Sequence, residues 1–363
     1  MTPEGWRQVS VLEACERTGR VPTVPRTEYQ AAGALPIVDQ GKGLIGGFTD
    51  APSARYPGPL PVFVFGDHTR EWKFIDFPFA AGADGTQLLR ARAGEDQRFV
   101  FEALRALPLQ SLGYSRHFKL LKELTLLLPP PGEQRKIAAI LSAVDDAIEA
   151  TQAVIEQLQV VKKAMIAELL THGLPHHAAL GPSPSSWAVR KLPEVCRPRQ
   201  WPTISKDQFT AEGYPVFGAN GQIGWFSSFN HEMPTIAITC RGATCGSINV
   251  TPPRSYVTGN AMCLDDLDPR VDIRFLAAYL EYVGVQRAIT GSAQPQITRE
   301  SLAAIEVEIP PIEEQAAIAG VLVSVDALIA SENGLAQAAR DVKAGLVHTL
   351  LSGAVRVTPD GQE

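Results

Sequence analysis

PPPGEQRKIAAILSAVDDAI (Pro129–Ile148) and PPIEEQAAIAGVLVSVDALI (Pro310–Ile329) are two versions of one segment, 181 positions apart in a chain of 363 residues. Ten of the twenty aligned positions are identical, far more than two unrelated segments share. The identities are Pro129, Pro130, Glu133, Gln134, Ile137, Ala138, Leu141, Val144, Asp145 and Ile148 with their counterparts. Self-similarity at a fixed separation is the sequence signature of a repeated structural unit.

The same shift pairs residues well outside this segment. It aligns Trp6 with Trp187, Glu13 with Glu194, Cys15 with Cys196, and Lys162 with Lys343. The chain is therefore predicted to be two copies of one unit, each a globular part followed by a long helix.

Each repeated segment opens a long amphipathic helix whose apolar residues recur every three or four positions. The predicted seam is Ile137, Leu141, Val144, Ile148, Ile155 and Leu158 in the first copy, and Ile318, Leu322, Val325 and Ile329 in the second. A sustained period of 3.5 residues places a narrow apolar stripe against a partner helix. We expect the two helices to form an antiparallel coiled coil. The alternative is that each helix packs on its own domain.

The ends of both helices are marked. Pro-Pro followed by acidic residues suits a helix N-terminus. Gly-containing stretches at His172-Gly173 and Ser352-Gly353 mark the C-termini. The first helix is thus expected over Glu133–Leu170, about 57 Å at 1.5 Å per residue.

The globular parts are predicted to be rich in strands. Leu60–Phe65, Pro234–Cys240 and Ile305–Ile309 are β-branched or alternating runs bounded by Gly and Pro. Arg98–Leu107 and Ile273–Val283 have short helical patterns. The fold class is therefore α+β, with two strand-rich domains separated by two long helices and an internal pseudo-two-fold repeat.

This organisation gives the following boundaries. The first domain covers residues 1–131, its helix 132–172, a Pro/Ser/Gly-rich linker 173–186, the second domain 187–309, its helix 310–353 and a tail 354–363.

Composition limits the classes of protein that the chain can be. Apolar residues make up 45% and charged residues 20%, which argues against wholesale disorder. No apolar run is long enough to span a membrane, and the first residues lack a signal-peptide core. Five cysteines suit reduced thiols better than a disulfide framework. A cytoplasmic protein without membrane contact is expected.

The net charge of −6 is unevenly distributed. The two domains carry +1 and −1, whereas the helix segments 132–172 and 310–363 carry −2 and −4. The acidic excess therefore lies in the helical segments, and a local basic face on either domain remains compatible with the sequence.

No catalytic set is evident. The tetrapeptide with which amino-methyltransferases hold a target base is absent, and no glycine fingerprint for a phosphate follows a strand. Asp67, Glu71 and Lys73 imitate the acidic and basic residues of a metal-dependent nuclease. Their spacing is too short for adjacent strands, and the second copy lacks them. We therefore predict no catalytic residue.

A zinc site could be assembled from His231, Cys240, Cys245 and Cys263. Structural zinc sites favour closely spaced pairs of cysteines, which these residues do not form. Buried free thiols are the preferred interpretation, and no metal site is predicted.

Gly-rich polar loops remain as candidate recognition elements. Asn, Gln and Arg side chains make the bidentate contacts that distinguish base edges in the major groove, although ordinary turn chemistry also uses Asn and Gly. The candidate DNA-binding residues are Lys42, Arg70, Lys73, Arg116, Asn220, Gln222, Arg241, Asn260, Gln294 and Gln296.

The combination of features resembles the specificity subunit of type I restriction-modification systems. The resemblance rests on two diverged domains, each followed by a Pro-Pro-x-x-Glu-Gln helix at Pro129 and Pro310. Looser family-like elements are Gly66-Asp-His-Thr69, Gly218-Ala-Asn-Gly221, Arg241-Gly242 and Gln294-Pro-Gln-Ile297. The loops of the first domain depart from this pattern, with Gly113-Tyr-Ser-Arg116 in place of the last element.

The resemblance implies a role in DNA recognition. Each domain would read half of a split site in double-stranded DNA, and the helices would set the spacer and dock the modification (methyltransferase) subunits. S-adenosylmethionine would be bound by those subunits and no cofactor by this chain, and a restriction subunit would join the complex. Two other classes stay open at this point: a coiled-coil scaffold without DNA specificity, and a self-contained restriction enzyme of related architecture.

Overall fold

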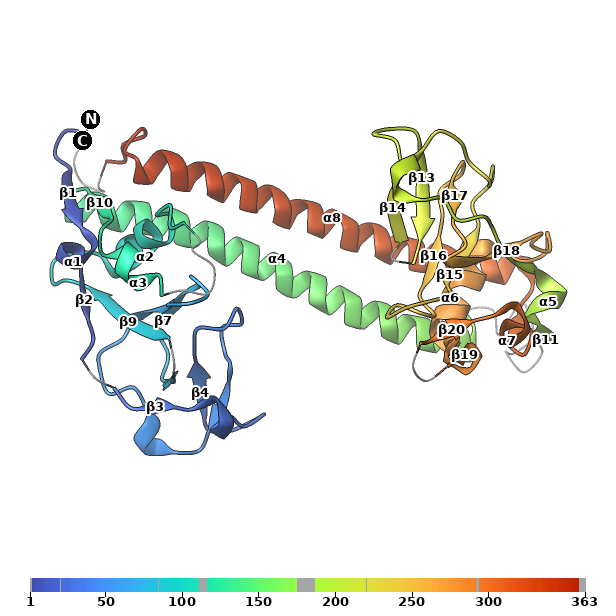
Figure 1. Ribbon diagram of the computed structural model, residues 1–363, viewed down its shortest axis with the longest axis horizontal. Helices are drawn as coiled ribbons and strands as arrows, with labels where there is room; N and C mark the ends of the chain where they lie inside the picture. Colours follow the sequence, from blue (N-terminus) through green and yellow to red (C-terminus); the bar gives the residue numbers. More distant parts are fainter. Residues whose placement is uncertain are drawn as a thin grey trace. The chain divides into compact units, whose positions relative to one another are not determined.

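The computed structural model describes residues 2–19, 21–83, 85–110, 116–174, 187–219, 221–291 and 294–358. The chain divides into two compact units, and each consists of one head together with part of both long helices, α4 (Pro131–His172) and α8 (Ile312–Leu351). Unit 1 contains Met1–Gln152 and Gly334–Glu363, and unit 2 contains Ala153–Asn333. Figure 1 labels the elements of both units.

Unit 1 is built on two four-stranded sheets and a two-stranded ribbon. Its strands are β1 (Arg7–Ser10), β2 (Cys15–Arg17), β3 (Thr23–Val24), β4 (Leu35–Val38), β5 (Gly47–Thr49), β6 (Val62–Gly66), β7 (Trp72–Ile75), β8 (Ala80–Gly82), β9 (Thr86–Ala91) and β10 (Thr125–Leu128). Its short helices are α1 (Val11–Ala14), α2 (Gln97–Arg105) and α3 (Phe118–Leu121). The sheet orders are β2-β9-β6-β7 and β3-β8-β4-β5, and β1 pairs with β10.

Unit 2 repeats this plan. Its strands are β11 (Ala188–Lys191), β12 (Arg197–Gln200), β13 (Tyr214–Gly218), β14 (Gly221–Phe226), β15 (Ile236–Thr239), β16 (Ile248–Val250), β17 (Tyr256–Val257), β18 (Ala261–Asp265), β19 (Ile289–Thr290), β20 (Gln296–Ile297) and β21 (Glu306–Ile309). Its short helices are α5 (Leu192–Val195), α6 (Ile273–Val283) and α7 (Arg299–Leu302).

Most paired strands of the two heads correspond, whereas β3 of unit 1 and the β19–β20 ribbon of unit 2 have no paired counterpart among the described residues. The sheet β12-β18-β15-β16 of unit 2 has the order of β2-β9-β6-β7 in unit 1, and the β11–β21 ribbon matches the β1–β10 ribbon. In the other sheets, β13 pairs antiparallel with β14 and parallel with β17, as β4 does with β5 and β8. The structure thus confirms the repeat that the sequence predicts.

The long helices run antiparallel beside each other within each unit (Figure 1). In unit 1, Ile137 and Leu141 of α4 share a hydrophobic core with Leu350 of α8. In unit 2, Leu169 of α4 shares a core with Ile318 of α8. The start of one helix therefore packs against the end of the other, as the predicted antiparallel coiled coil requires.

All ten predicted seam residues are buried or half-buried. The buried ones are Ile137, Leu141, Ile155, Ile318, Leu322 and Val325, and the half-buried ones are Val144, Ile148, Leu158 and Ile329. The helices begin and end within a few residues of the predicted positions, because Pro and Gly limit them as expected.

The repeated Gln of the Pro-Pro-x-x-Glu-Gln motif ties each long helix to its head. Gln134 donates from Nε2 to the carbonyl of Pro129 at 2.9 Å and accepts at Oε1 from the backbone N–H of Asp96 at 2.8 Å. Asp96 is the N-cap of α2. One amide side chain thus satisfies backbone groups at two helix starts, which would otherwise be buried without partners.

Unit 2 has the same arrangement. Gln315 donates to the carbonyl of Pro310 at 2.8 Å and accepts from the N–H of Asp272, the N-cap of α6, at 2.8 Å. The motif is therefore a connection between head and helix, which explains why both copies retain it.

The predicted strands and short helices are present with small changes of boundary. Strands β15 and β21 lie within their predicted runs, and β6 extends one residue beyond its run to Gly66. Helix α2 starts at Gln97, and α6 spans Ile273–Val283 as predicted. The compact units, however, cut across both long helices instead of separating helices from heads.

Candidate nucleic-acid interface

A groove lined by several arginines lies on the head of unit 2 and has a volume of about 550 Å³. Its polar lining residues are Arg197, Arg199, Gln200, Arg241, Gln296, Thr298, Arg299 and Glu300. Four guanidinium groups against one carboxylate give this groove a positive balance, although the second domain as a whole is near neutral. Such local concentrations of arginine suit phosphate and base-edge recognition.

Two predicted residues that are far apart in the sequence meet in this groove. Arg241 and Gln296 face each other across an isolated antiparallel β-bridge, and the N–H of Ile297 donates to the carbonyl of Cys240 at 3.0 Å. Both side chains are exposed. Gly242 has a φ of 86°, a conformation that favours glycine, so the chain turns sharply directly after Arg241.

Groove residues that the sequence did not single out come from β12 and from the start of α7, where Thr298, Arg299 and Glu300 lie. Arg199 stacks over the ring of Trp201 with its guanidinium carbon 4.1 Å from the ring centroid. Gln200 donates to the carbonyl of Gly259 at 2.9 Å. Arg197 makes only an exposed ion pair of 3.6 Å with Asp266, which costs little to break. The pattern Arg-x-Arg before Trp201 was the feature of the sequence that could have indicated the groove residues of β12.

The other predicted residues of unit 2 that the structure describes do not line this groove. Gln294 and Gln222 are exposed, and Asn260 is half-buried and accepts the N–H of Cys240 at its carbonyl, at 3.0 Å. Asn220 lies outside the described residues. The hydroxyls of Thr239 and Thr244 both bond the carbonyl of Ala219, at 2.7 and 2.9 Å.

In unit 1, three of the four predicted residues are exposed. Lys42 lies in the turn before β5, and Arg116 lies before α3. Arg70 has a positive φ of 64° and donates from Nη1 to the carbonyl of Leu109 at 3.1 Å.

Lys73, the fourth predicted residue of unit 1, is buried, contrary to what a DNA contact requires. It is 6% exposed, and its Nζ donates to the carbonyl of Asp39 at 2.7 Å. Burial lowers the pKa of its ammonium group, and the carboxylate of Asp39 opposes this effect. The alternating pattern of β7 places Lys73 on the inner face, so it leaves the candidate set.

The set of Asp67, Glu71 and Lys73, which resembles a metal-dependent nuclease site in residue type, does not form a site either. The carboxylate of Asp67 accepts the N–H of Phe118 at 2.7 Å, while Lys73 is directed to Asp39. Asp67 thus anchors the start of α3, which is a structural task.

The cysteines are free, as predicted, with Cys15, Cys196, Cys240 and Cys263 buried and Cys245 half-buried. Burial raises the pKa of the Cys15 and Cys196 thiols to about 12. Of the four residues considered for a zinc site, only His231 and Cys263 belong to the group of potential ligand atoms found among the described residues, and Cys240 does not.

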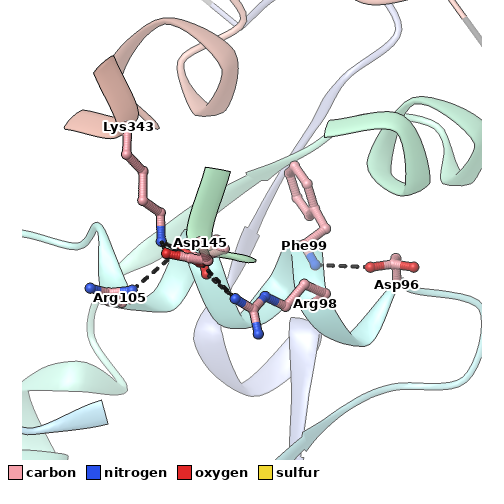
Figure 2. Close-up of polar contacts among 7 residues, drawn as sticks. Asp96, Arg98, Phe99, Arg105, Asp145 and Lys343 are labelled. Carbon is pink, nitrogen blue, oxygen red and sulfur yellow. Dashed lines mark hydrogen bonds and ion pairs between the residues drawn. The ribbon is translucent and has the colours of Figure 1, made fainter. Parts of the chain in front are cut away.

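The helices of unit 1 carry a cluster of charges beneath α2, drawn in Figure 2. Asp145 of α4 contacts Lys343 of α8 at 2.6 Å and Arg98 of α2 at 2.7 Å. Glu102, only 2% exposed, lies 3.5 Å from Lys343 and 3.7 Å from Arg105. This ionic cluster connects one head helix to both long helices.

The fold and the repeat define a class of protein in which two homologous heads are joined by two antiparallel helices. The sequence profile described as "Type I restriction modification DNA specificity domain" matches residues 104–160 and 184–339, more than half of the chain. The chain belongs to this family.

Relatives and solved structures agree with this assignment. The putative type I restriction enzyme MjaX specificity subunit of Methanocaldococcus jannaschii is 28% identical over 281 residues, covering 71% of this chain and 65% of that protein. The MjaVIII specificity subunit of the same organism is 26% identical over 276 residues, covering 66% and 64%. The aligned regions thus span just under two thirds of these relatives.

Two solved structures share the fold. The S subunit of a type I restriction-modification system from M. genitalium has a TM-score of 0.69 at 17% identity, covering 95% of this chain and 96% of that one. A chain from a study of complex assembly and conformational transition of the type I R-M system has a TM-score of 0.56 at 18% identity, covering 98% and 100%.

Proposed function

We propose that this chain is the DNA-specificity subunit of a type I restriction-modification complex, and that each head reads one half of a bipartite site. The observation that carries the proposal is the groove of unit 2, where Arg241 and Gln296 meet beside Arg197, Arg199 and Arg299. Arg and Gln are the side chains that bind guanine and adenine edges bidentately, and further arginines suit the neighbouring phosphates.

The chain itself has the role of a reader, and catalysis belongs to its partners. Modification subunits would bind S-adenosylmethionine and transfer its methyl group to DNA, and a restriction subunit would cleave DNA. The complex would act in the cytoplasm. None of the described helices has the length and apolarity of a membrane span.

The long helices offer surfaces for such protein partners. In unit 2, Val160 and Leu328 are 60% and 54% exposed, and in unit 1, Leu335 and Val342 are 58% and 57% exposed. Contiguous exposed apolar patches mark sites where another protein packs, and we infer that these side chains contribute to such patches on the helices. The spacer between the half-sites would follow from the length of these helices, about 60 Å for 40 residues.

The groove is tested by replacing Arg241 and Gln296 singly with Ala in the full chain, assayed with its co-expressed methyltransferase subunits on a library of duplexes. Because a good bidentate contact contributes about 1–3 kcal/mol of discrimination, we expect preference at one half-site to fall roughly tenfold to a hundredfold. The other half-site should be unchanged.

Arg254→Ala is the matched control, because Arg254 is an exposed arginine of the same head that pairs with Glu232 at 3.3 Å outside the groove. Its preference should equal that of the unaltered chain. Equal preferences for all variants would refute the groove as the reader, and the absence of any sequence preference in the unaltered complex would instead support a scaffold.

A further inference from the structure

His231, Cys263 and Asp265 form a compact polar cluster in the head of unit 2, outside the arginine groove. One ligand atom from each residue lies within 4.8 Å of the other two. Cys263 and Asp265 are two positions apart on β18 and so project from the same face of the sheet. His231 comes from the loop between β14 and β15. The three side chains are largely withdrawn from solvent, with exposed fractions of 9% for His231 and 12% for Asp265.

The hydrogen bonds of Asn230 fix which nitrogen of His231 carries a proton. Asn230 donates from Nδ2 to the carbonyl of Val257 and accepts at Oδ1 from the N–H of Val257, both at 2.9 Å. Its amide orientation is therefore determined, and Oδ1 can only accept. Since Nδ1 of His231 lies 2.6 Å from this oxygen, Nδ1 must be the donor.

The other ring nitrogen then faces a carboxylate. Nε2 of His231 lies 3.0 Å from Oδ1 of Asp265. In a neutral imidazole protonated at Nδ1, Nε2 is a lone pair, and two lone pairs at this distance repel each other. A proton, held by the ring nitrogen or by the carboxyl group, or a metal cation must therefore lie between them.

The surroundings match the outer partners that metal ligands have in proteins. A ligating histidine almost always donates its second ring N–H to a carbonyl or carboxylate, and ligating carboxylates are hydrogen-bonded in turn. Here Asn230 accepts from His231, and the indole N–H of Trp201 donates to Oδ2 of Asp265 at 3.0 Å. Cys263 adds a thiol sulfur to this group, although it also packs in the hydrophobic core with Ala237 and Val257.

We propose that His231 Nε2, Cys263 Sγ and a carboxylate oxygen of Asp265 bind a divalent transition-metal ion, with zinc as the expected ion. A nitrogen, sulfur and oxygen donor set suits Zn²⁺ or Co²⁺ and disfavours Mg²⁺ and Ca²⁺, which prefer oxygen. Three protein ligands leave one position of a tetrahedral ion for water. Binding displaces the thiol proton of Cys263 to solvent, so affinity rises with pH.

The ion would have a positioning role. It would fasten the loop of Asn230 and His231 to β18, below Trp201, whose ring packs edge-on against His231 with centroids 5.1 Å apart. The opposite contact of Trp201 is the cation–π stack with Arg199, a groove residue. The head of unit 1 offers no equivalent site, because the matching positions of β9, which pairs with β2 as β18 does with β12, are Leu88 and Arg90.

The test measures metal bound to the untagged full chain. Protein treated with a chelator is incubated with excess Zn²⁺ at pH 8, freed of unbound metal by gel filtration and analysed by mass spectrometry. We expect one zinc ion per chain. Co²⁺ should replace zinc and produce a sulfur-to-cobalt charge-transfer band in the near ultraviolet together with the visible bands of a tetrahedral ion.

The variants Cys263→Ala and His231→Gln should each lose the ion and the cobalt bands. Cys196→Ala is the control, because Cys196 is another buried thiol of unit 2 and lies outside the cluster. Its thiol donates a hydrogen bond to the carbonyl of Leu192. This variant should keep one ion. Metal content far below one per unaltered chain, with no cobalt band, would overturn the proposal in favour of a simple hydrogen bond between His231 and Asp265. Undiminished metal in folded Cys263→Ala and His231→Gln proteins would also overturn it.

Discussion

Replacing Asp145 with Ala is expected to destabilise unit 1 by about 2–3 kcal/mol. Asp145 contacts Lys343 at 2.6 Å and Arg98 at 2.7 Å, and its loss leaves three basic groups around Glu102 as the remaining acid (Figure 2). Breaking a fully buried pair costs about 3–5 kcal/mol. The effect here is smaller because Asp145 is 28% exposed. Urea unfolding followed by circular dichroism measures it.

The repeat supplies a matched control for this variant. Asp326 occupies the equivalent position in unit 2 and pairs with Lys162 at 2.7 Å, but it is 55% exposed. Exposed pairs contribute about 0–1 kcal/mol, so Asp326→Ala should change the unfolding midpoint little. Combining Asp145→Ala with Lys343→Met should restore part of the loss, because one unpaired charge is removed. Equal effects of Asp145→Ala and Asp326→Ala would contradict the role assigned to the ionic cluster.

Replacing Arg356 with Ala should destabilise unit 1 at neutral pH by about 2–3 kcal/mol, because it leaves a buried carboxylate poorly paired. Arg356 donates to Glu133 from Nε at 2.8 Å and from Nη2 at 2.9 Å, and Glu133 is 4% exposed. Trp6 donates to the same carboxylate at 3.1 Å. The residues after α8 thus hold the Glu of the first Pro-Pro-x-x-Glu-Gln motif.

The effect of Arg356→Ala should depend on pH. Burial opposes ionisation of Glu133, but the hydrogen bonds from Arg356, Val357 and Trp6 outweigh it and hold the pKa of this carboxyl below its ordinary value of 4.5. Its stabilising contribution is therefore present above pH 4.5 and is lost as the pH falls through the lower, folded-state pKa. The difference in unfolding free energy between the unaltered chain and the variant should shrink in acid.

Arg340→Ala is the control for this experiment, since Arg340 is an exposed arginine of α8 in the same unit. Surface substitutions of this kind usually change stability by no more than about 0.5 kcal/mol. A deficit of Arg356→Ala that stays constant from pH 7 to pH 3 would show that the pairing with Glu133 is not its cause.

Much of the fold was predictable because the repeat and the helix pattern are local signals. The 3.5-residue period identified the seam, and Pro-Pro and Gly marked the helix ends, since these residues act on the backbone wherever they occur. The sequence could not indicate that Gln134 and Gln315 cap helices of the heads, because these bonds join residues about forty positions apart.

The candidate site was only partly predictable. Arg241 and Gln296 were selected by side-chain type, and folding brought them together through a bridge that no short-range pattern contains. Lys73 was wrongly placed because a single lysine does not disclose which face of β7 is buried. Arg199 was missed although the Arg-x-Arg pattern before Trp201 stands in the sequence, because the stacking of Arg199 on Trp201 is visible only in the folded chain.

The most direct test of the central claim is a map of methylated bases in a host genome. The chain is deleted and then restored, either unaltered or as an Arg241→Ala/Gln296→Ala double variant, and methylation is read by single-molecule sequencing. We expect a split motif that vanishes on deletion and returns with the unaltered chain. The double variant should relax one half while keeping the other half and the spacer. A continuous motif, or a double variant that alters both halves equally, would contradict two independently reading heads.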